Sequence, residues 1–223
     1  MIIAIDGFSA TGKSTLARNL AHALGYIFLD TGAMYRAVTY YLLSHNIDWK
    51  NPQQLEDALL QITIAFQRKA DGTTITLLNG ADVEEPIRGM EVANKVSEVA
   101  AVSAVRRFLV KQQRIIGADN KVVMDGRDIG TVVFPDATLK LFVIADFEVR
   151  VRRRWLELQQ SGTQLTLEEV AENLRKRDRE ETERTDSPLA QAADAIVLDS
   201  THLSPKAMLD SALNLAKERS GKH

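Results

Sequence analysis

The chain has 223 residues, of which 45% are hydrophobic and 26% charged, and its formal net charge is −2. This length can bury a full core, as one large domain or as a core with small insertions, and the near-neutral charge excludes a global basic field for nucleic acid or anionic membranes. The lack of cysteine excludes disulfides and thiol chemistry. The sequence begins directly with a predicted strand and has no apolar run of membrane-spanning length, so we expect no signal peptide and a cytoplasmic protein.

The first predicted elements form a phosphate-binding unit. Ile2–Ile5 is an unbroken apolar run, typical of a strand buried on both faces of a parallel sheet. It leads into Gly7–Ser14, which reads G-x-x-x-x-G-K-S, and a helix with leucines at helical spacing should follow and end near Gly25. Lys13 would supply charge for the β- and γ-phosphates, and the Ser14 hydroxyl could ligate Mg²⁺. The predicted ATP-binding residues are Gly7, Phe8, Ser9, Ala10, Thr11, Gly12, Lys13, Ser14 and Thr15.

The second predicted strand is Tyr26–Leu29, and it ends in the polar residues Asp30-Thr31-Gly32. Ligands of α/β sheets bind at the carboxyl ends of strands. Arg36 lies a few residues further on, in the next helix. The residues alone leave two roles open for Arg36, a solvated helix position or phosphate binding.

Residues 61–86 follow a different pattern. Alternating runs at Ile62–Phe66 and Thr74–Leu78, with turn signals at Asp71-Gly72 and Asn79-Gly80, predict a small antiparallel meander. Such a meander does not fit a parallel α/β core. We therefore expect an insertion here.

The next segment carries a second candidate site. One long helix is expected over about Met90–Ile116, because apolar residues mark a single stripe. The third strand, Lys121–Asp125, ends in a carboxylate. Mg²⁺ beside a phosphate loop needs a nearby acid. Asp125 is therefore expected to hold the metal through water, together with Ser14. The loop Gly126–Gly130 then presents an Arg–Asp pair, which fits either a functional site or a structural ion pair.

The last third of the chain contains two arginine-rich helices between residues 150 and 184. A fourth strand, Leu139–Ile144, precedes them, and a capping box at Thr166–Glu169 starts the second helix. The segment is nearly neutral, so it is either a solvated face or a lid that places selected arginines over phosphates. A final strand, Ala195–Leu198, leads to a helix that Ser204-Pro205 should start.

Together these residues resemble the bacterial cytidylate kinases, a family of small nucleoside monophosphate kinases. The similarity covers nearly the whole chain, and Asp125–Ala137 is its most distinctive part. Gly7–Thr15, Asp30–Arg36, Arg177-Asp178 and Leu198–Thr201 add to it. The resemblance implies a P-loop three-layer α/β fold with a five-stranded parallel sheet, a small antiparallel β insertion in the monophosphate-binding domain, and a helical lid.

The resemblance also implies a division of the chain into three parts. The expected core comprises residues 1–33, 101–149 and 186–223. The expected monophosphate-binding domain comprises residues 34–100, with the insertion at about 61–86. The expected lid comprises residues 150–185.

The implied reaction is Mg²⁺-dependent transfer of the γ-phosphoryl group of ATP to CMP or dCMP. By position in the family, the implied substrate-binding residues are Thr31, Arg36, Ser97, Arg106, Arg127, Asp128, Arg177, Glu181 and Arg184. The implied catalytic residues are Lys13, Arg127, Arg177 and Arg184. The resemblance implies that Arg36, Arg127 and Arg184 hold the CMP phosphate, that Ser97, Arg106 and Asp128 face cytosine, and that Arg177 reaches the sugar or the phosphates.

Two positions depart from the family pattern. Thr31 stands where the family usually has Ser, which keeps the hydroxyl. Glu181 stands where the family usually has Asp, an acid expected to contact the sugar, so the extra methylene group changes the reach of that contact. No nucleic-acid or membrane partner is expected, and a monomer is predicted.

Two other functions remain open from the residues. The first is a P-loop kinase for another small acceptor, such as UMP, AMP or shikimate. The second is a P-loop nucleotide switch, which would lack a second set of phosphate-binding arginines; this chain offers Arg36, Arg127 and Arg184 as such a set.

Overall fold

The structure is a computed structural model that describes residues 1–69, 73–118, 121–160 and 162–220. The chain divides into two compact units. The first unit consists of Met1–Phe28 and Asn120–His223, and the second consists of Leu29–Asp119.

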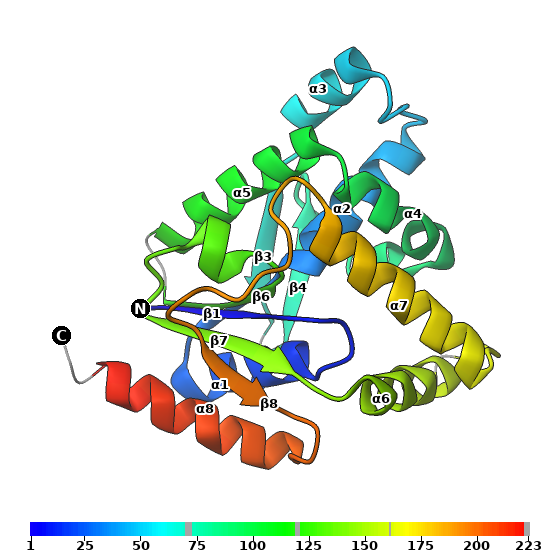
Figure 1. Cartoon of the computed structure of the whole chain (residues 1–223). Coiled ribbons are helices and arrows are strands. Elements are labelled where there is room, and N and C mark those ends of the chain that lie inside the picture. The colour runs from blue at the N-terminus through cyan, green and yellow to red at the C-terminus, as the bar shows by residue number, and fades with distance from the viewer. Residues whose placement is uncertain (70–72, 119–120, 161, 221–223) are drawn as a thin grey trace. The chain divides into compact units, whose positions relative to one another are not determined.

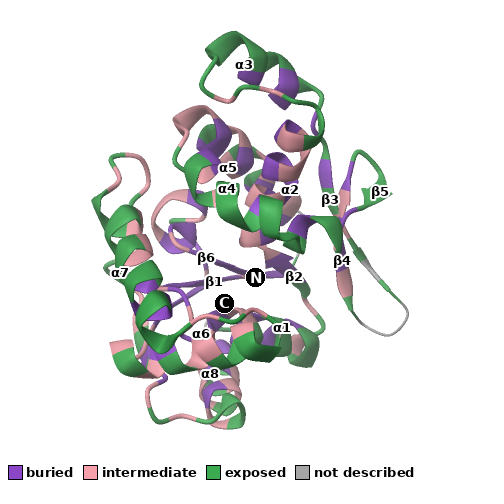
Figure 2. Cartoon of the chain, turned by 90° about the vertical axis from the view of Figure 1, so that its right-hand side faces the viewer, coloured by how far each residue is buried: buried purple, intermediate pink, exposed green. Residues whose placement is uncertain are grey.

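The chain forms a five-stranded parallel sheet, as predicted, with four strands wholly in the first unit and the boundary between the units within the strand Ile27–Asp30 (Figure 1). Its strands are β1 (Ile2–Gly7), β2 (Ile27–Asp30), β6 (Val122–Gly126), β7 (Leu139–Ile144) and β8 (Ile196–Asp199), in the order β2-β6-β1-β7-β8. The apolar runs seen in the sequence become these strands because a parallel sheet is covered on both faces. In Figure 2, β1 and β6 are coloured as buried. Since β1 lies between β6 and β7, the loops after β1 and β6 are neighbours at one edge of the sheet.

Two helices cover one face of this sheet. They are α1 (Lys13–Leu24), which follows the phosphate loop, and α8 (Pro205–Ser220), which starts at the predicted Ser204-Pro205 signal. Leu16 and Leu20 of α1 pack with apolar residues of β1, β7 and α8 in one core cluster. Gly25 caps α1 with φ 68, the left-handed conformation that favours glycine.

The two arginine-rich helices are α6 (Phe147–Gln160) and α7 (Leu167–Glu183). They share a small apolar cluster of their own, formed by Val151, Val170, Ala171 and Leu174. The predicted capping box is confirmed, because the Thr166 side chain accepts from the Glu169 amide and the Glu169 carboxylate accepts from the Thr166 amide.

The second unit combines four helices with a three-stranded antiparallel sheet. The helices are α2 (Thr31–Ser44), α3 (Pro52–Leu60), α4 (Met90–Ala100) and α5 (Ser103–Ala118), and the strands are β3 (Ile64–Arg68), β4 (Thr74–Leu78) and β5 (Ala81–Asp82). A short 3₁₀ turn, Pro86–Arg88, follows the sheet.

The predicted antiparallel meander is confirmed. Strands β3, β4 and β5 pair in that order, and Asn79 and Gly80 both have positive φ, 50 and 83, as the turn between β4 and β5 requires (Figure 2). The other predicted turn, Asp71-Gly72, lies outside the described residues.

The single long helix predicted over Met90–Ile116 is wrong. The structure has two helices, α4 and α5, with a break at Ala101-Val102. The Val102 carbonyl accepts the first hydrogen bond of α5, from the Arg106 amide at 3.1 Å, while the Val102 amide turns back to Val99 at 3.1 Å. No glycine or proline marks this break. We attribute the break to packing, since α4 and α5 each contact α2 and also contact one another within the second unit.

Candidate active site

The phosphate loop connects β1 to α1 and has the backbone that the predicted motif requires. Gly7 has φ 149, and a Cβ atom there would lie 2.2 Å from the Val143 carbonyl oxygen, so no other residue fits. Ala10 and Gly12 also have positive φ, 61 and 84. The Thr11 hydroxyl donates to the Phe8 carbonyl at 3.0 Å and holds the loop. The amides at the start of α1 therefore face the interior of this loop, an arrangement suited to an anion.

Lys13 is buried at the base of this loop, where its ammonium donates to the Phe8 carbonyl at 3.2 Å. Burial, together with the nearby Arg127 guanidinium, lowers the pKa of Lys13 to about 7. A buried ammonium with a depressed pKa gains most from an anionic ligand, because such a ligand compensates its desolvation.

The Ser14 side chain, in the first turn of α1, contacts the Asp125 side chain near the end of β6. The Ser14 hydroxyl donates to the Asp125 carboxylate at 2.5 Å. Both groups offer the hard oxygen donors that Mg²⁺ prefers. In the described parts of the chain, no group of three or more His, Cys, Asp or Glu side chains could hold a metal alone. The residues fit Mg²⁺ that is shared with nucleotide phosphates and water, the usual coordination of this ion.

Arg127, from the loop after β6, connects three segments of the first unit. Its guanidinium donates to the Glu181 carboxylate of α7 at 2.6 Å, to the Ser9 hydroxyl of the phosphate loop at 2.8 Å, and to the Gly126 carbonyl at 3.2 Å. Burial opposes the charge of both partners, but the pairing prevails: the Glu181 carboxylate raises the pKa of Arg127, and the Arg127 guanidinium lowers the pKa of Glu181. Both partners of the Arg127–Glu181 ion pair are therefore charged.

The arginines of α6 and α7 differ in their partners. Arg177 lies 3.7 Å from Glu181, and burial lowers the pKa of Arg177. Arg150 forms a bidentate pair with Asp178, at 3.1 and 2.7 Å, and stacks over the Phe8 ring at 5.0 Å. Arg150 thus ties α6, α7 and the phosphate loop together, a contact that sequence reasoning missed because no local signal distinguishes it from its neighbours.

Two more arginines of this region donate to backbone carbonyls. Arg153 donates to the Ser200 carbonyl at 2.7 Å, and the Ser200 hydroxyl donates to the Thr11 carbonyl at 2.8 Å, which braces the phosphate loop from behind. Arg184, just after α7, donates to the Ser187 carbonyl at 2.7 Å.

A buried carboxylate that the sequence analysis did not single out lies beside these groups. Asp6 precedes Gly7 at the end of β1, and its two oxygens accept from the Ile129 amide at 2.9 Å and the Gly130 amide at 2.7 Å. Burial raises the pKa of Asp6 to about 6. Asp128, the predicted cytosine-facing residue, is also buried, 6% exposed.

The remaining predicted substrate residues lie in the second unit. Thr31 is buried at the first turn of α2, where Asp30 caps the helix by accepting from the Ala33 amide at 2.9 Å. Arg36 donates to the Asp30 carboxylate at 3.0 Å. A Cβ atom at Gly32 would lie 3.1 Å from the Arg36 guanidinium, so this glycine makes room for that arginine.

Ser97 and Arg106 belong to α4 and α5 of the same unit. Ser97 is exposed on α4. Arg106 is 2% exposed, with its guanidinium 5.7 Å from the centre of the Tyr35 ring and donating to the Ala100 carbonyl at 3.4 Å. Arg106 is one of the largest fully buried side chains in the described chain, an unusual position for arginine.

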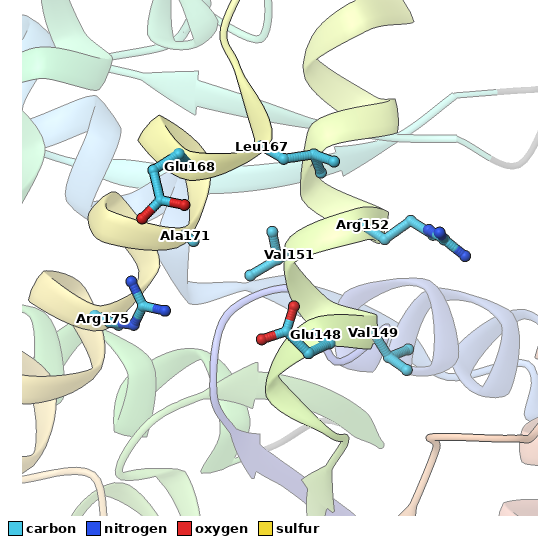
Figure 3. Close-up of a pocket in the computed structure, with 8 residues that line it drawn as sticks. All are labelled: Glu148, Val149, Val151, Arg152, Leu167, Glu168, Ala171 and Arg175. Atoms are coloured by element: carbon cyan, nitrogen blue, oxygen red, sulfur yellow. The ribbon is translucent and has the colours of Figure 1, made fainter.

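A hollow of about 380 Å³ lies between α6 and α7 (Figure 3). Its lining carries two acids and two arginines, Glu148, Glu168, Arg152 and Arg175, with apolar side chains between them. It contains none of the predicted site residues. The chemistry described above is therefore elsewhere, at the edge of the sheet.

The fold and this site define a class. A P-loop nucleotide kinase has a parallel sheet with a phosphate loop after its central strand, and this chain has that loop with a buried lysine. The site also has a serine–carboxylate pair and an arginine that joins the loop to a helical pair.

The comparisons with known proteins identify the family. The chain belongs to the cytidylate kinase family, whose model matches residues 3–218. It is 52% identical to the cytidylate kinase of Parabacteroides distasonis over 207 residues, which cover 91% of this chain and 90% of that protein. It is 49% identical to the cytidylate kinase of Flavobacterium psychrophilum over 217 residues, 96% of each chain.

A solved structure of an uncharacterized protein from Eubacterium ventriosum aligns over 96% of this chain and 97% of that chain, with a TM-score of 0.53. Its sequence identity is 12%, so this likeness concerns the fold alone.

The family decides between the functions that the residues left open. The chain is an enzyme, a transferase with cytidylate kinase activity, and membership of this kinase family implies the use of ATP. No helix in the described ranges is long and apolar enough to cross a membrane.

Proposed function

We propose that the chain transfers the γ-phosphoryl group of ATP to CMP or dCMP, with Mg²⁺, through the residues gathered at the end of β1. The observation that carries the proposal is the assembly of Lys13, Arg127 and the Ser14–Asp125 pair around one phosphate loop. Each of these groups has a defined partner and a charge or dipole suited to a polyphosphate.

The reaction needs no general base. The second pKa of a phosphate monoester is near 6, so the attacking phosphate oxygen of CMP is already ionised at pH 7. The obstacle is that two anions must meet. Lys13, the loop amides and the arginines of the site would neutralise this charge, and they would hold the phosphoryl group in line with its acceptor.

Ser14 and Asp125 are the residues that would hold the metal, with Asp125 acting through water. When bound, Mg²⁺ would screen the β- and γ-phosphate charge during the transfer. Asp125 accepts from Ser14, and this hydrogen bond holds the Ser14 hydroxyl and the Asp125 carboxylate side by side.

Glu181 holds Arg127 at the phosphate loop, and this pairing suggests an exchange of partners. A phosphate oxygen of the substrate is the same kind of ligand as the Glu181 carboxylate. We propose that a substrate phosphate takes over part of the Arg127 guanidinium, and that the released Glu181 contacts the sugar, with Arg177 beside it. Arg184 would join Arg127 at the CMP phosphate.

The family pattern assigns further residues to binding of the acceptor. Arg36 would bind the CMP phosphate, and Thr31 would contact the nucleotide near Asp30. Ser97, Arg106 and Asp128 would face the cytosine ring. Support for this arrangement comes from the match of these residues to the positions of the family pattern.

Base selection follows from the direction of hydrogen bonds. Cytosine carries an amino group that donates, and uracil has an accepting oxygen at the same place. The Asp128 carboxylate can accept from cytosine but would face an acceptor in uracil, and an unpaired buried polar group costs about 1–3 kcal/mol.

The decisive experiment is a panel of acceptors, CMP, dCMP, UMP, AMP and shikimate, with ATP and Mg²⁺ and detection of ADP release. CMP or dCMP should give the highest kcat/KM. Turnover that favoured AMP or UMP would contradict the proposal.

A single substitution tests base selection. Asp128→Ala should lower the ratio of kcat/KM for CMP to that for UMP by on the order of tenfold or more, with little change in the KM for ATP. Asp136→Ala is the matched control, because Asp136 is an exposed acid a few residues along the same loop and should leave the ratio unchanged. An unchanged ratio in Asp128→Ala would show that Asp128 does not recognise the base.

The cytoplasm remains the compartment proposed from the sequence.

A further inference from the structure

Asp6 is a buried acid with no role in the reaction as proposed. It is the penultimate residue of β1, 4% exposed, and its neighbour Gly7 opens the phosphate loop. Its Oδ1 atom accepts from the Ile129 amide at 2.9 Å and its Oδ2 atom from the Gly130 amide at 2.7 Å. A charged group at this depth is unfavourable unless specific donors stabilise it.

A carboxylate is the side chain that suits two adjacent amides. Each of its oxygens takes one N–H group, whereas asparagine has one accepting oxygen and one NH₂ group that would face a second N–H. Burial raises the pKa of Asp6 to about 6, and the two amides and Arg127 act in the opposite direction. The chain therefore retains a buried charge that desolvation disfavours. The hydrogen bonds of this charge are those from the Ile129 and Gly130 amides.

The amides held by Asp6 belong to the residues directly after Asp128. They start a single π-helical turn, Ile129–Val133, in which the Asp128 carbonyl accepts from the Val132 amide at 2.8 Å and the Val133 amide at 3.1 Å. The backbone around Asp128 is thus held by the turn on one side and by Asp6 on the other. These contacts restrict the backbone of Asp128, and with it the direction in which its Cα–Cβ bond points.

Gly130 shows how closely the loop packs on Asp6. A Cβ atom at Gly130 would lie 3.3 Å from Asp6 Oδ2 and 3.1 Å from Lys140 Cδ. Asp6 also pairs in register with Gly126 across β1 and β6. Asp6 is therefore the neighbour of Gly7 in the phosphate loop, and its carboxylate also holds the Arg127–Gly130 loop.

We infer that Asp6 is a positioning residue for acceptor selection, which holds the Arg127–Gly130 loop so that Asp128 presents its carboxylate to the cytosine amino group. This inference rests on the proposed role of Asp128 in reading the base. It assigns to Asp6 no contact with substrate. Asp6 acts through Asp128, and it sets the place of Asp128 with respect to the phosphate loop.

The test uses the full chain and steady-state kinetics with CMP, UMP and ATP. Asp6→Asn should lower the CMP-to-UMP ratio of kcat/KM by on the order of tenfold and raise the KM for CMP, while the KM for ATP stays within about twofold of the original chain. In the Asp128→Ala background, Asp6→Asn should cause no further loss of the ratio, because the residue through which it acts is gone.

Two more variants separate positioning from general destabilisation. Gly130→Ala disturbs the same contact from the loop side and should lower the ratio in the same direction; it also keeps the inference testable if Asp6→Asn does not fold. Leu20→Ala removes a fully buried side chain from the core of the same unit, and it should lower the melting temperature with the ratio unchanged.

The outcomes distinguish this inference from the proposed function. If Asp128→Ala lowers the ratio and Asp6→Asn and Gly130→Ala do not, the inference is overturned and the role of Asp128 stands. A fall of the ratio in Leu20→Ala as large as that in Asp6→Asn would also overturn it. If Asp128→Ala leaves the ratio unchanged, the proposed base recognition fails, and the inference fails with it.

Discussion

Lys13 combines burial with a positive charge, and its environment explains how one side chain serves the phosphate loop. Burial and the nearby Arg127 guanidinium lower the pKa of the ammonium to about 7. Arg127 and Glu181 are partly buried, with side chains 19% and 15% exposed, and each neutralises the other. At the scale of single residues, the site thus contains an ion pair, Arg127–Glu181, and a buried ammonium, that of Lys13, which donates to the Phe8 carbonyl.

The depressed pKa of Lys13 predicts proton uptake when ATP binds. At pH 8 most Lys13 side chains are neutral before binding, and the phosphates raise the pKa and restore the ammonium, so uptake should approach one proton. At pH 6 the side chain is already protonated, and uptake should be near zero. Calorimetric titration with Mg²⁺ and ATP in two buffers of different ionisation enthalpy measures this number.

Lys13→Arg is the control for this measurement, because a guanidinium keeps its proton at both pH values. It should show no uptake at pH 8. Equal apparent enthalpies in both buffers for the original chain at pH 8 would contradict the depressed pKa.

The helical pair α6–α7 has a core of its own, separate from the core under the sheet. Val151, Val170, Ala171 and Leu174 form it, and Leu174 is fully buried, 0% exposed. Asp178 and Glu181 follow on α7 and bind Arg150 and Arg127. At the scale of elements, this small cluster supports the side chains that contact the phosphate loop. Disruption of the cluster should therefore destabilise α6 and α7 before it destabilises the sheet.

Leu174→Ala tests this separation. The substitution should cost about 2–5 kcal/mol locally, as large-to-small changes in cores do, and it should lower kcat because Arg177 and Glu181 lose their support. Hydrogen exchange should speed up over residues 147–160 and 167–183, with β1, β6 and β7 still protected.

The comparison variant is again Leu20→Ala, in the core of α1 and the sheet. It should lower the protection of the strands and leave that of α6 and α7 largely as it was. Uniform loss of protection in both variants would show that the two clusters unfold together.

At the scale of the whole molecule, the described residues present no large apolar surface that calls for a second copy. The large apolar side chains that are exposed in the described ranges each come from a different element, namely Ile27, Leu60, Met90, Ile115, Leu156, Leu167 and Val197. Isolated apolar residues are normal on the surface of a monomer. We therefore predict a monomer of 24.8 kDa.

Light scattering on a gel-filtration column measures this mass directly. A single species near 24.8 kDa, with and without ATP and CMP, is the expected result. A mass near twice this value, stable on dilution, would contradict the prediction.

Local signals determined a large part of this protein from the sequence. The phosphate loop, its flanking strand and helix, the Thr166–Glu169 capping box and the Asn79-Gly80 turn each depend on residues within a few positions of one another. Short-range sterics and backbone hydrogen bonds decide such features, so the sequence reveals them. The distinctive run after β6 was also sufficient to indicate the family.

Tertiary structure decided what the local pattern could not. The helix break at Ala101-Val102 follows from packing on α2, and nothing in its residues announces it. The contact of Asp6 with Gly130 joins residues 124 positions apart, and that of Arg127 with Glu181 joins residues 54 apart. The strengths of such contacts, and the pKa values that follow from them, depend on burial, which only the folded chain creates. The roles of Ser97, Arg106 and Arg36 toward a bound nucleotide stay predictions for the same reason. Which ligand a side chain binds depends on the groups that surround it in the folded chain.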